Sequence, residues 1–337
     1  MNRPAIVQSL MALQDPNLRL RRLARFLTEA PEQEVAPTIE QAARNAQSGQ
    51  QREFYVTLVQ LLLHVRPRPV LPGGPLPMPE RQWLLSELRV ANLIGAAVTG
   101  QLPFAARLLR DAFAPPRAGD ERLLPPHPSI EPIPLGTRRE RARLPRKDLL
   151  LPLLLDTTPS VVLLLAENPR IVQAHALQMA TLRPTHPYAL QALLMPLRWL
   201  ADEKIAEAVA RNPAAPAWLV LALAPLLPRK VLAALVHLAW IDASVRALLA
   251  GWLGLDGQVI EAAVATAAAG RDPEVFYVDE AELHEPLQAP GGPVRPSSVP
   301  AATPPGEVTR IHQRTPVEPS NSDADQGGAS IGPEAHS

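Results

Sequence analysis

Proline makes up 40 of the 337 residues of this chain, and its placement limits which folds the chain can adopt. A proline inside a helix or a central strand removes a backbone hydrogen bond and clashes with the preceding turn. So many prolines must therefore lie at the starts of elements or between them. In the stretch RNPAAPAWLVLALAPLLPRKVLAAL (211–235), four prolines interrupt an apolar run. We predict short helices, each opened by a proline in its first turn, where the missing N–H has no helical partner to lose.

Three proline-opened segments recur at nearly constant spacing. DTTPSVVLLLA, RPTHPYALQALL and RNPAAPAWLVLALA place their helix-opening prolines at Pro159, Pro187 and Pro216, which are 28 and 29 residues apart. Further apolar segments alternate with them, at 168–180, 197–210 and 228–239. A period of this size is typical of solenoids, in which each helix is covered on both sides by its neighbours and can be apolar all round.

The units NPAAPAWLVLALA and AENPRIVQAHALQMA resemble the leucine-rich repeat variant family and, more broadly, the HEAT-like α-solenoid families. Those families repeat an Asn/Asp-Pro, a second proline or small residue, and a Val-Leu-x-x-Leu-Ala helix. The resemblance covers about residues 148–255 and implies a right-handed stack of short helices with a concave face. The prototype of the leucine-rich repeat variant family also carries a cysteine-bound iron–sulfur module. This chain has no cysteine, so neither the cluster nor a redox role is implied for it.

We therefore expect an all-α fold, an α-solenoid of short proline-initiated helices with proline-rich linkers and a disordered C-terminal tail. Its regions are an N-terminal helical region (1–114, with a proline-rich break at 66–80), a proline-rich linker (115–135), an α-helical repeat domain (136–270) and an acidic tail (271–337). The tail is expected to be mostly disordered because its composition cannot offset chain entropy by burial. In the first region, Pro37 fits the first turn of a helix that ends at Gly49.

The most apolar run of the chain is close to the length of a transmembrane helix, but it contains prolines that disfavour such a helix. Residues 212–228 form an uncharged run of 17, about the shortest length that can span a bilayer, but four prolines break it. The N-terminus lacks the uninterrupted apolar region and the cleavage site of a signal peptide. We expect no membrane span and a cytoplasmic location.

The charges balance at 33 basic against 33 acidic residues, but they are unevenly distributed. Residues 1–135 carry a net +3, residues 136–270 a net +4 and residues 271–337 a net −7. A body this weakly basic is unlike a dedicated nucleic-acid binder. The densest basic run, GTRRERARLPRK (136–147), nevertheless supplies candidates for an anion-binding surface: Arg138, Arg139, Arg141, Arg143, Arg146 and Lys147. The alternative is a solvated helix surface, which is the usual role of a charge run.

No group of residues has the spacing of a catalytic, metal or cofactor site. Without cysteine, thiolate catalysis and cysteine-bound metals are excluded. His175, His186 and His237 lie in three different repeats, and none has a second ligand at helical spacing. A glycine-rich phosphate loop is also missing, and residues 1–114 offer no credible nucleophile. We expect a protein that is not an enzyme and that binds no cofactor.

Tryptophan and arginine in the repeats supply the candidates for partner binding. A large aromatic side chain in a concave groove often anchors a partner protein, although core packing is its commoner role. The candidates are Trp199, Trp218, Trp240, Arg183, Arg198 and Arg211. We predict a helical-repeat scaffold or adaptor that binds another protein. The alternative is a HEAT-like protein that binds nucleic acid through the basic segment 138–147.

Overall fold

The structure is a computed structural model that describes residues 5–47, 49–66, 85–116 and 122–269. All regular secondary structure within these ranges is helical, which confirms the predicted all-α class. The described ranges belong to one compact unit. The predicted tail (271–337) and nearly all of the predicted break at 66–80 lie outside the described residues.

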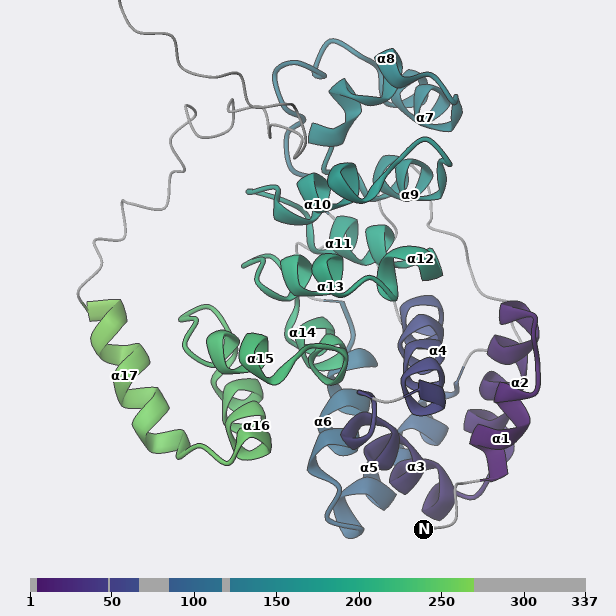
Figure 1. The fold of residues 1–337 in the computed structure, drawn as a ribbon, viewed down its shortest axis with the longest axis vertical. Helices are drawn as coiled ribbons and strands as arrows, with labels where there is room; N and C mark the ends of the chain where they lie inside the picture. The colour runs from purple at the N-terminus through teal and green to yellow at the C-terminus, as the bar shows by residue number, and fades with distance from the viewer. Residues whose placement is uncertain (1–4, 48, 67–84, 117–121, 270–337) are drawn as a thin grey trace, which may run out of the picture. The chain divides into compact units, whose positions relative to one another are not determined.

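The N-terminal part of the unit consists of helices of 7 to 17 residues (Figure 1). They are α1 (Ala5–Met11), α2 (Pro16–Glu29), α3 (Glu32–Arg44), α4 (Gly49–Val65), α5 (Glu87–Thr99) and α6 (Pro103–Ala112). Helices α2 and α6 begin with a proline. Asp15 caps α2, because its carboxylate accepts a hydrogen bond from the Asn17 N–H at 2.8 Å. These starts follow the proline rule that the sequence suggests.

The predictions for Pro37 and Gly49 are wrong. Helix α3 begins at Glu32, so Pro37 lies inside it rather than in its first turn. Proline has no backbone N–H, so α3 lacks one internal hydrogen bond at this position. Pro37 is exposed, so its ring lies outside the core. Gly49 begins α4 instead of ending α3, with φ of +35°, a value that favours glycine.

The C-terminal part is built from helices of 3 to 13 residues. They are α7 (Leu135–Arg143), α8 (Lys147–Leu150), η2 (Pro152–Leu155), α9 (Pro159–Glu167), α10 (Gln173–Thr181), α11 (Pro187–Leu194), α12 (Leu197–Leu200), α13 (Glu203–Ala210), α14 (Ala217–Leu223), η3 (Ala224–Leu226), α15 (Arg229–Leu235), α16 (Ala243–Leu253) and α17 (Gly257–Ala269). Pro159 and Pro187 occupy the first positions of α9 and α11, and Pro216 is the N-cap residue of α14. The prediction that these prolines open helices is confirmed.

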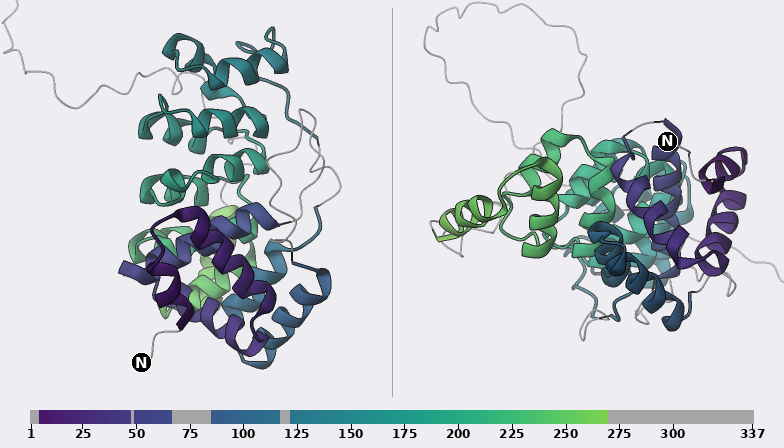
Figure 2. Two further views of the ribbon diagram at one scale, coloured as in Figure 1. Left: turned by 90° about the vertical axis from the view of Figure 1, so that its right-hand side faces the viewer. Right: turned by 90° about the horizontal axis from the view of Figure 1, so that it is seen from below.

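Helices of the C-terminal part pack against one another in several pairs. Helix α9 packs between α7 and α11, and α10 packs against α13 (Figure 1). Helix α14 follows, in contact with α13 and with α6 of the N-terminal part (Figure 2). Because α9, α11 and α14 have neighbours on more than one side, nearly every residue in them is buried. That burial explains why their sequences are apolar all round.

Side-chain amides join the end of one helix to the next layer. Asn212 donates from its Nδ2 to the carbonyls of Ala180 and Leu182 at the end of α10, at 2.9 and 3.1 Å. Asn168 makes the same pair of bonds to Ala142 and Leu144 at the end of α7, at 2.8 and 3.0 Å. The last carbonyls of a helix have no partner within it, so these bonds satisfy groups that would otherwise be orphaned.

The N-terminal helices pack directly onto the C-terminal ones. Gln47 donates to the carbonyls of Pro225 and Leu227 at 2.7 and 2.8 Å, in the same pattern as the two asparagines. The buried Tyr55 hydroxyl donates to the Ala222 carbonyl at 3.0 Å. One hydrophobic core runs through both parts of the unit. Among the described helices, none combines the length and the hydropathy that crossing a bilayer requires.

Candidate functional site

Three of the predicted partner-binding residues lie together at one edge of the helices. The loop before α11 carries Arg183, the loop before α14 begins at Arg211, and the loop before α16 contains Trp240. Arg183 Nη2 donates to the Arg211 carbonyl at 3.1 Å. The Arg183 Cζ lies 5.8 Å from the centroid of the Trp240 ring, within cation–π range. We call these three residues the Arg183 cluster.

The two arginines of the Arg183 cluster differ in charge compensation. Arg211 is the C-cap residue of α13, and its Nε lies 2.9 Å from Oε1 of Glu207 in that helix. This ion pair neutralises the charge of Arg211. Arg183 is exposed, and among the described residues no carboxylate lies within ion-pair distance of it. The cluster therefore carries one uncompensated positive charge, held in place by a carbonyl and by an aromatic ring.

Arg198 and Trp199 lie after the far end of α11 and are separated from the Arg183 cluster by that helix. Arg198 Cζ stacks 4.3 Å above the Trp199 ring, and its Nη2 donates to the Ala166 and Asn168 carbonyls at 2.5 and 2.8 Å. Burial lowers the pKa of Arg198 from its ordinary value. Trp199 itself is buried, and its Nε1 donates to the Ala166 carbonyl at 2.8 Å. This pair ties α12 to the end of α9.

Trp218 belongs to the core of the unit. Only 3% of it is exposed, and the Arg66 guanidinium lies 4.6 Å from its ring centroid. Arg66 is also buried and donates to Gln191 Oε1 at 2.6 Å. The structure thus places Trp199 and Trp218 among packed helices and leaves Trp240 half-buried at the edge.

The six residues of the basic segment have different environments. Arg138 is buried and forms an ion pair of 2.6 Å with Asp156, whose side chain is fully buried. Arg146 pairs with Asp148 at 2.7 Å in solvent, and this contact lowers the pKa of Asp148. Of the remaining four, two are half-buried (Arg139 and Arg141) and two are exposed (Arg143 and Lys147). Arg138 is therefore engaged inside the unit, whereas Arg143 and Lys147 face solvent.

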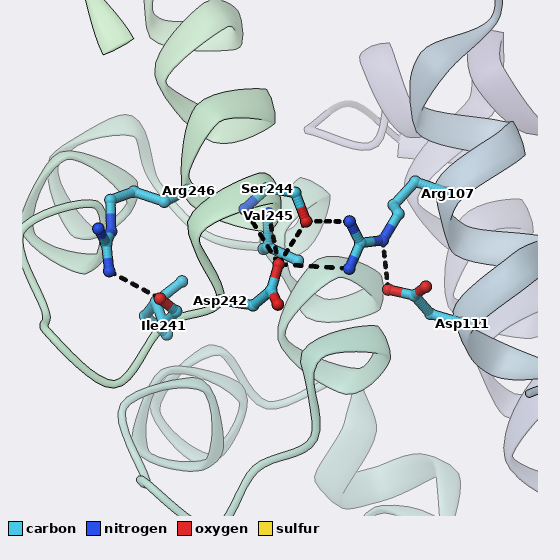
Figure 3. A network of polar contacts seen from close by, with 7 residues as sticks. All are labelled: Arg107, Asp111, Ile241, Asp242, Ser244, Val245 and Arg246. Atoms are coloured by element: carbon cyan, nitrogen blue, oxygen red, sulfur yellow. Dashed lines mark hydrogen bonds and ion pairs between the residues drawn. The ribbon is translucent and has the colours of Figure 1, made fainter. Parts of the chain in front are cut away.

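A polar network that could not be predicted from the sequence joins α6 to α16 (Figure 3). Arg107 of α6 pairs with Asp111 on its own helix and with Asp242 Oδ1 at 3.3 Å, and it also donates to the Ser244 hydroxyl. Asp242 caps α16 by accepting from the Ser244 and Val245 N–H groups at 3.0 and 3.2 Å. The Asp-x-Ser pattern before an apolar run is a recognisable cap signal. Nothing in the sequence points to Arg107 as its partner.

Burial by itself would raise the pKa of Asp242. Hydrogen bonds from Ser244 and Val245, together with the positive charge of Arg107, outweigh burial and hold that pKa below its ordinary value. Asp242 is thus kept ionised as a cap and as an ion-pair partner. The Ser244 hydroxyl donates to the Asp242 carboxylate and accepts from the Arg107 guanidinium, so it links the cap of α16 to α6.

The described part of the chain brings no three His, Asp or Glu side chains close enough together to hold a metal ion. The Arg183 cluster brings together three of the six predicted partner-binding residues, and Arg198 with Trp199 forms a separate pair. Comparison of the chain with protein-family models, with curated proteins and with solved structures found no match.

Proposed function

We propose that this chain is a non-enzymatic α-solenoid scaffold that binds another protein, and that the partner presents a carboxylate-bearing segment to the Arg183 cluster. The observation that carries the proposal is the uncompensated charge of Arg183, fixed by the Arg211 carbonyl and the Trp240 ring. Proline-opened helices whose prolines lie 28 and 29 residues apart, and the packing of α9 against α11, support the solenoid part of the proposal. Such stacks use surfaces formed by successive repeats for binding.

The chemistry of the Arg183 cluster suits an acidic segment of a protein. A guanidinium presents several N–H donors in one plane, and its bonds to a carboxylate are charge-assisted, each contributing about 1.5–3 kcal/mol. Arg183 uses Nη2 for the Arg211 carbonyl, which leaves its other N–H groups for a ligand. Because the guanidinium is already positioned, less side-chain entropy is lost on binding than for a free arginine. The half-buried Trp240 adds apolar surface beside the charge.

The test is cross-linking and affinity purification with the full chain, comparing wild type with R183Q/W240L. The matched control is R170Q, which removes the same charge from an exposed arginine outside the cluster. We expect a partner that wild type and R170Q recover equally and that R183Q/W240L loses, with cross-links to the loops before α11, α14 and α16. Equal recovery by R183Q/W240L, or cross-links confined to α1–α6, would contradict the proposal.

A second candidate function, binding to a nucleic-acid backbone, is favoured by the exposed Arg143 and Lys147 in the basic segment. Neither side chain has a carboxylate at ion-pair distance among the described residues. A salt-dependent mobility shift that the double variant R143Q/K147Q abolishes would support this function. The absence of any shift at low salt would eliminate it.

A further inference from the structure

A cavity of about 470 Å³ lies where α3 meets α15 and α16. Its wall combines residues from the end of α3 with residues far along the chain, in α15 and at the end of α16. Small-molecule sites in proteins have volumes of roughly 300–1,000 Å³ and often lie where two parts of a chain meet. The cavity has the volume and the location of such a site, and it lies apart from the Arg183 cluster.

One part of this wall is apolar and partly aromatic. Trp252 lines the cavity, and its ring stacks on the fully buried Phe104 with centroids 4.7 Å apart. That stack fixes the indole, so it provides a rigid surface against which a flat or branched apolar group can pack. Leu232 and Leu253 line the cavity beside it. These side chains favour a ligand whose body is hydrophobic.

Two guanidiniums, those of Arg44 and Arg229, also line the cavity, and they contribute unequal charge. Arg44 Nε and Nη2 both donate to Glu40 Oε1, at 3.2 and 3.0 Å, so this arginine neutralises a buried carboxylate. Arg229 donates to the Leu253 carbonyl at 3.2 Å, and among the described residues no carboxylate lies at ion-pair distance from it. The wall therefore carries a net charge of one, which matches a single carboxylate.

We propose that this cavity binds a small monocarboxylate with a compact apolar body, such as an aryl or branched-chain acid. The carboxylate pairs with Arg229, and the apolar body packs against Trp252 and Leu232. Because the cavity is lined by helices of both parts of the unit, the bound acid stabilises their contact increasingly as its concentration rises above its Kd.

The test measures binding of 1-naphthaleneacetate to the full chain by titration calorimetry, with the neutral 1-naphthaleneacetamide as the matched ligand. The acid should bind with a Kd below about 1 mM, a modest affinity for a ligand of this size. The amide keeps the apolar body and lacks the charge, so it should bind about tenfold more weakly. Failure of the acid to bind, or equal binding of acid and amide, would overturn the proposal.

Charge variants identify the cation that holds the acid. R229Q should weaken binding of the acid about tenfold and leave binding of the amide unchanged. K230Q removes the same charge from the next residue, which is exposed and does not line the cavity. We expect wild-type affinity for K230Q. Equal affinities of R229Q and K230Q for the acid would overturn the proposal.

A substitution that fills the cavity with a larger side chain tests whether the acid binds there. Gly251 lines the cavity within α16, and a Cβ at this position would meet no atom within 4 Å. G251L should therefore abolish binding while the protein stays folded, since leucine is a better helix former than glycine by roughly 1 kcal/mol. The control is G95L, because Gly95 lies in α5 and is equally open. If G251L still binds the acid, or if G95L abolishes binding instead, the acid does not bind in this cavity.

Discussion

Arginine accounts for 30 of the 33 basic residues, and many of these side chains bind backbone carbonyls. Arg198 bridges the Ala166 and Asn168 carbonyls. Arg246 pairs with Glu261 at 2.6 Å. It also donates to the Ile241 carbonyl at 2.7 Å, as Figure 3 shows. A planar guanidinium with five donors can make such bonds in several directions at once, which a lysine ammonium does less well. In this chain the arginines therefore act in part as caps for helix ends.

The ion pair between Arg138 and Asp156 gives a residue-scale prediction. R138M should lower the free energy of unfolding by about 3 kcal/mol, because it leaves the Asp156 carboxylate buried without a positively charged partner. The double variant R138M/D156N removes both charges, and the amide oxygen that it introduces can still accept the Thr158 N–H bond that Asp156 accepts at 2.8 Å. The double variant should recover most of the loss. Urea denaturation of the three proteins measures the difference.

Arg146 and Asp148 supply the control for that prediction. Their side chains are 65% and 62% exposed, so R146M should change the free energy of unfolding by less than about 0.5 kcal/mol. Equal effects of R138M and R146M would show that the buried ion pair has no special role.

At the scale of elements, the same kind of side-chain bridge joins helices at three places. Asn168, Asn212 and Gln47 each donate to two carbonyls that lie two residues apart at the end of a helix or 3₁₀ turn. Asn212 uses its Oδ1 as well, accepting the Ala214 N–H at 3.0 Å. One side chain thus ends one element and positions the start of another.

N212D tests this role at nearly constant volume. The aspartate keeps an oxygen for the Ala214 N–H but places a second oxygen, in a side chain only 1% exposed, against the Ala180 and Leu182 carbonyls. We expect a loss of about 3 kcal/mol in the free energy of unfolding, because two carbonyls lose their donor beside a buried charge. N17D, in the exposed first turn of α2, should be neutral or slightly stabilising. Thermal denaturation with both variants separates the effects.

The starts of several helices could be predicted from the sequence, because they depend on neighbouring residues. Pro159 and Pro187 open helices by fixing their own φ, and Asp15 caps one through its own side chain. Burial was not readable in the same way. Both Trp218 and Trp240 follow an alanine in an apolar segment, yet Trp218 is buried beside Arg66, which lies far away in the chain, and Trp240 is half-buried at an edge.

The candidate site was predictable only in part, for the same reason. The repeat register placed Arg183 and Arg211 at equivalent positions, and the structure brings them together. Arg198 lies between them in the sequence but after the far end of α11. Arg107 could not be identified, because its partner Asp242 is 135 residues away and the contact depends on how α6 meets α16.

For the described unit as a whole, the contact between its N-terminal and C-terminal helices is stabilised by polar bonds as well as by the shared core. Tyr55 and Gln47 bind carbonyls around α14 and η3, and Arg107 binds the cap of α16. The two sets of helices should therefore unfold together rather than as separate domains.

The Asp242 carboxylate gives this contact a pH dependence. Its pKa in the folded protein lies below the ordinary value of 3.8, so its contribution is complete above that value and is lost as the pH falls through the lower, folded one. Wild type should be more stable than D242N by about 0.5–1 kcal/mol at pH 7, as for a partly exposed pair. The difference should shrink below pH 3.8.

Urea denaturation of wild type and D242N at pH 7, 5, 4 and 3 measures this difference. In the R107Q background, D242N should change stability less, because Arg107 is one of the groups that lower the pKa of Asp242. A difference between wild type and D242N that is independent of pH would contradict the assignment.

Each asparagine bridge joins only neighbouring helices, and this limits which insertions and deletions the chain can accommodate. The side-chain amide N–H groups of Asn168 and Asn212 each reach the end of one other helix, so neither bridge joins more than two helices. Duplicating one helix pair in register would give the new copy an asparagine amide as donor on one side and helix-end carbonyls as acceptors on the other. An insertion of one or two residues within a pair would separate an asparagine from its carbonyls. Evolution by whole-unit gain or loss is therefore compatible with this architecture, and small internal insertions in the helices are not.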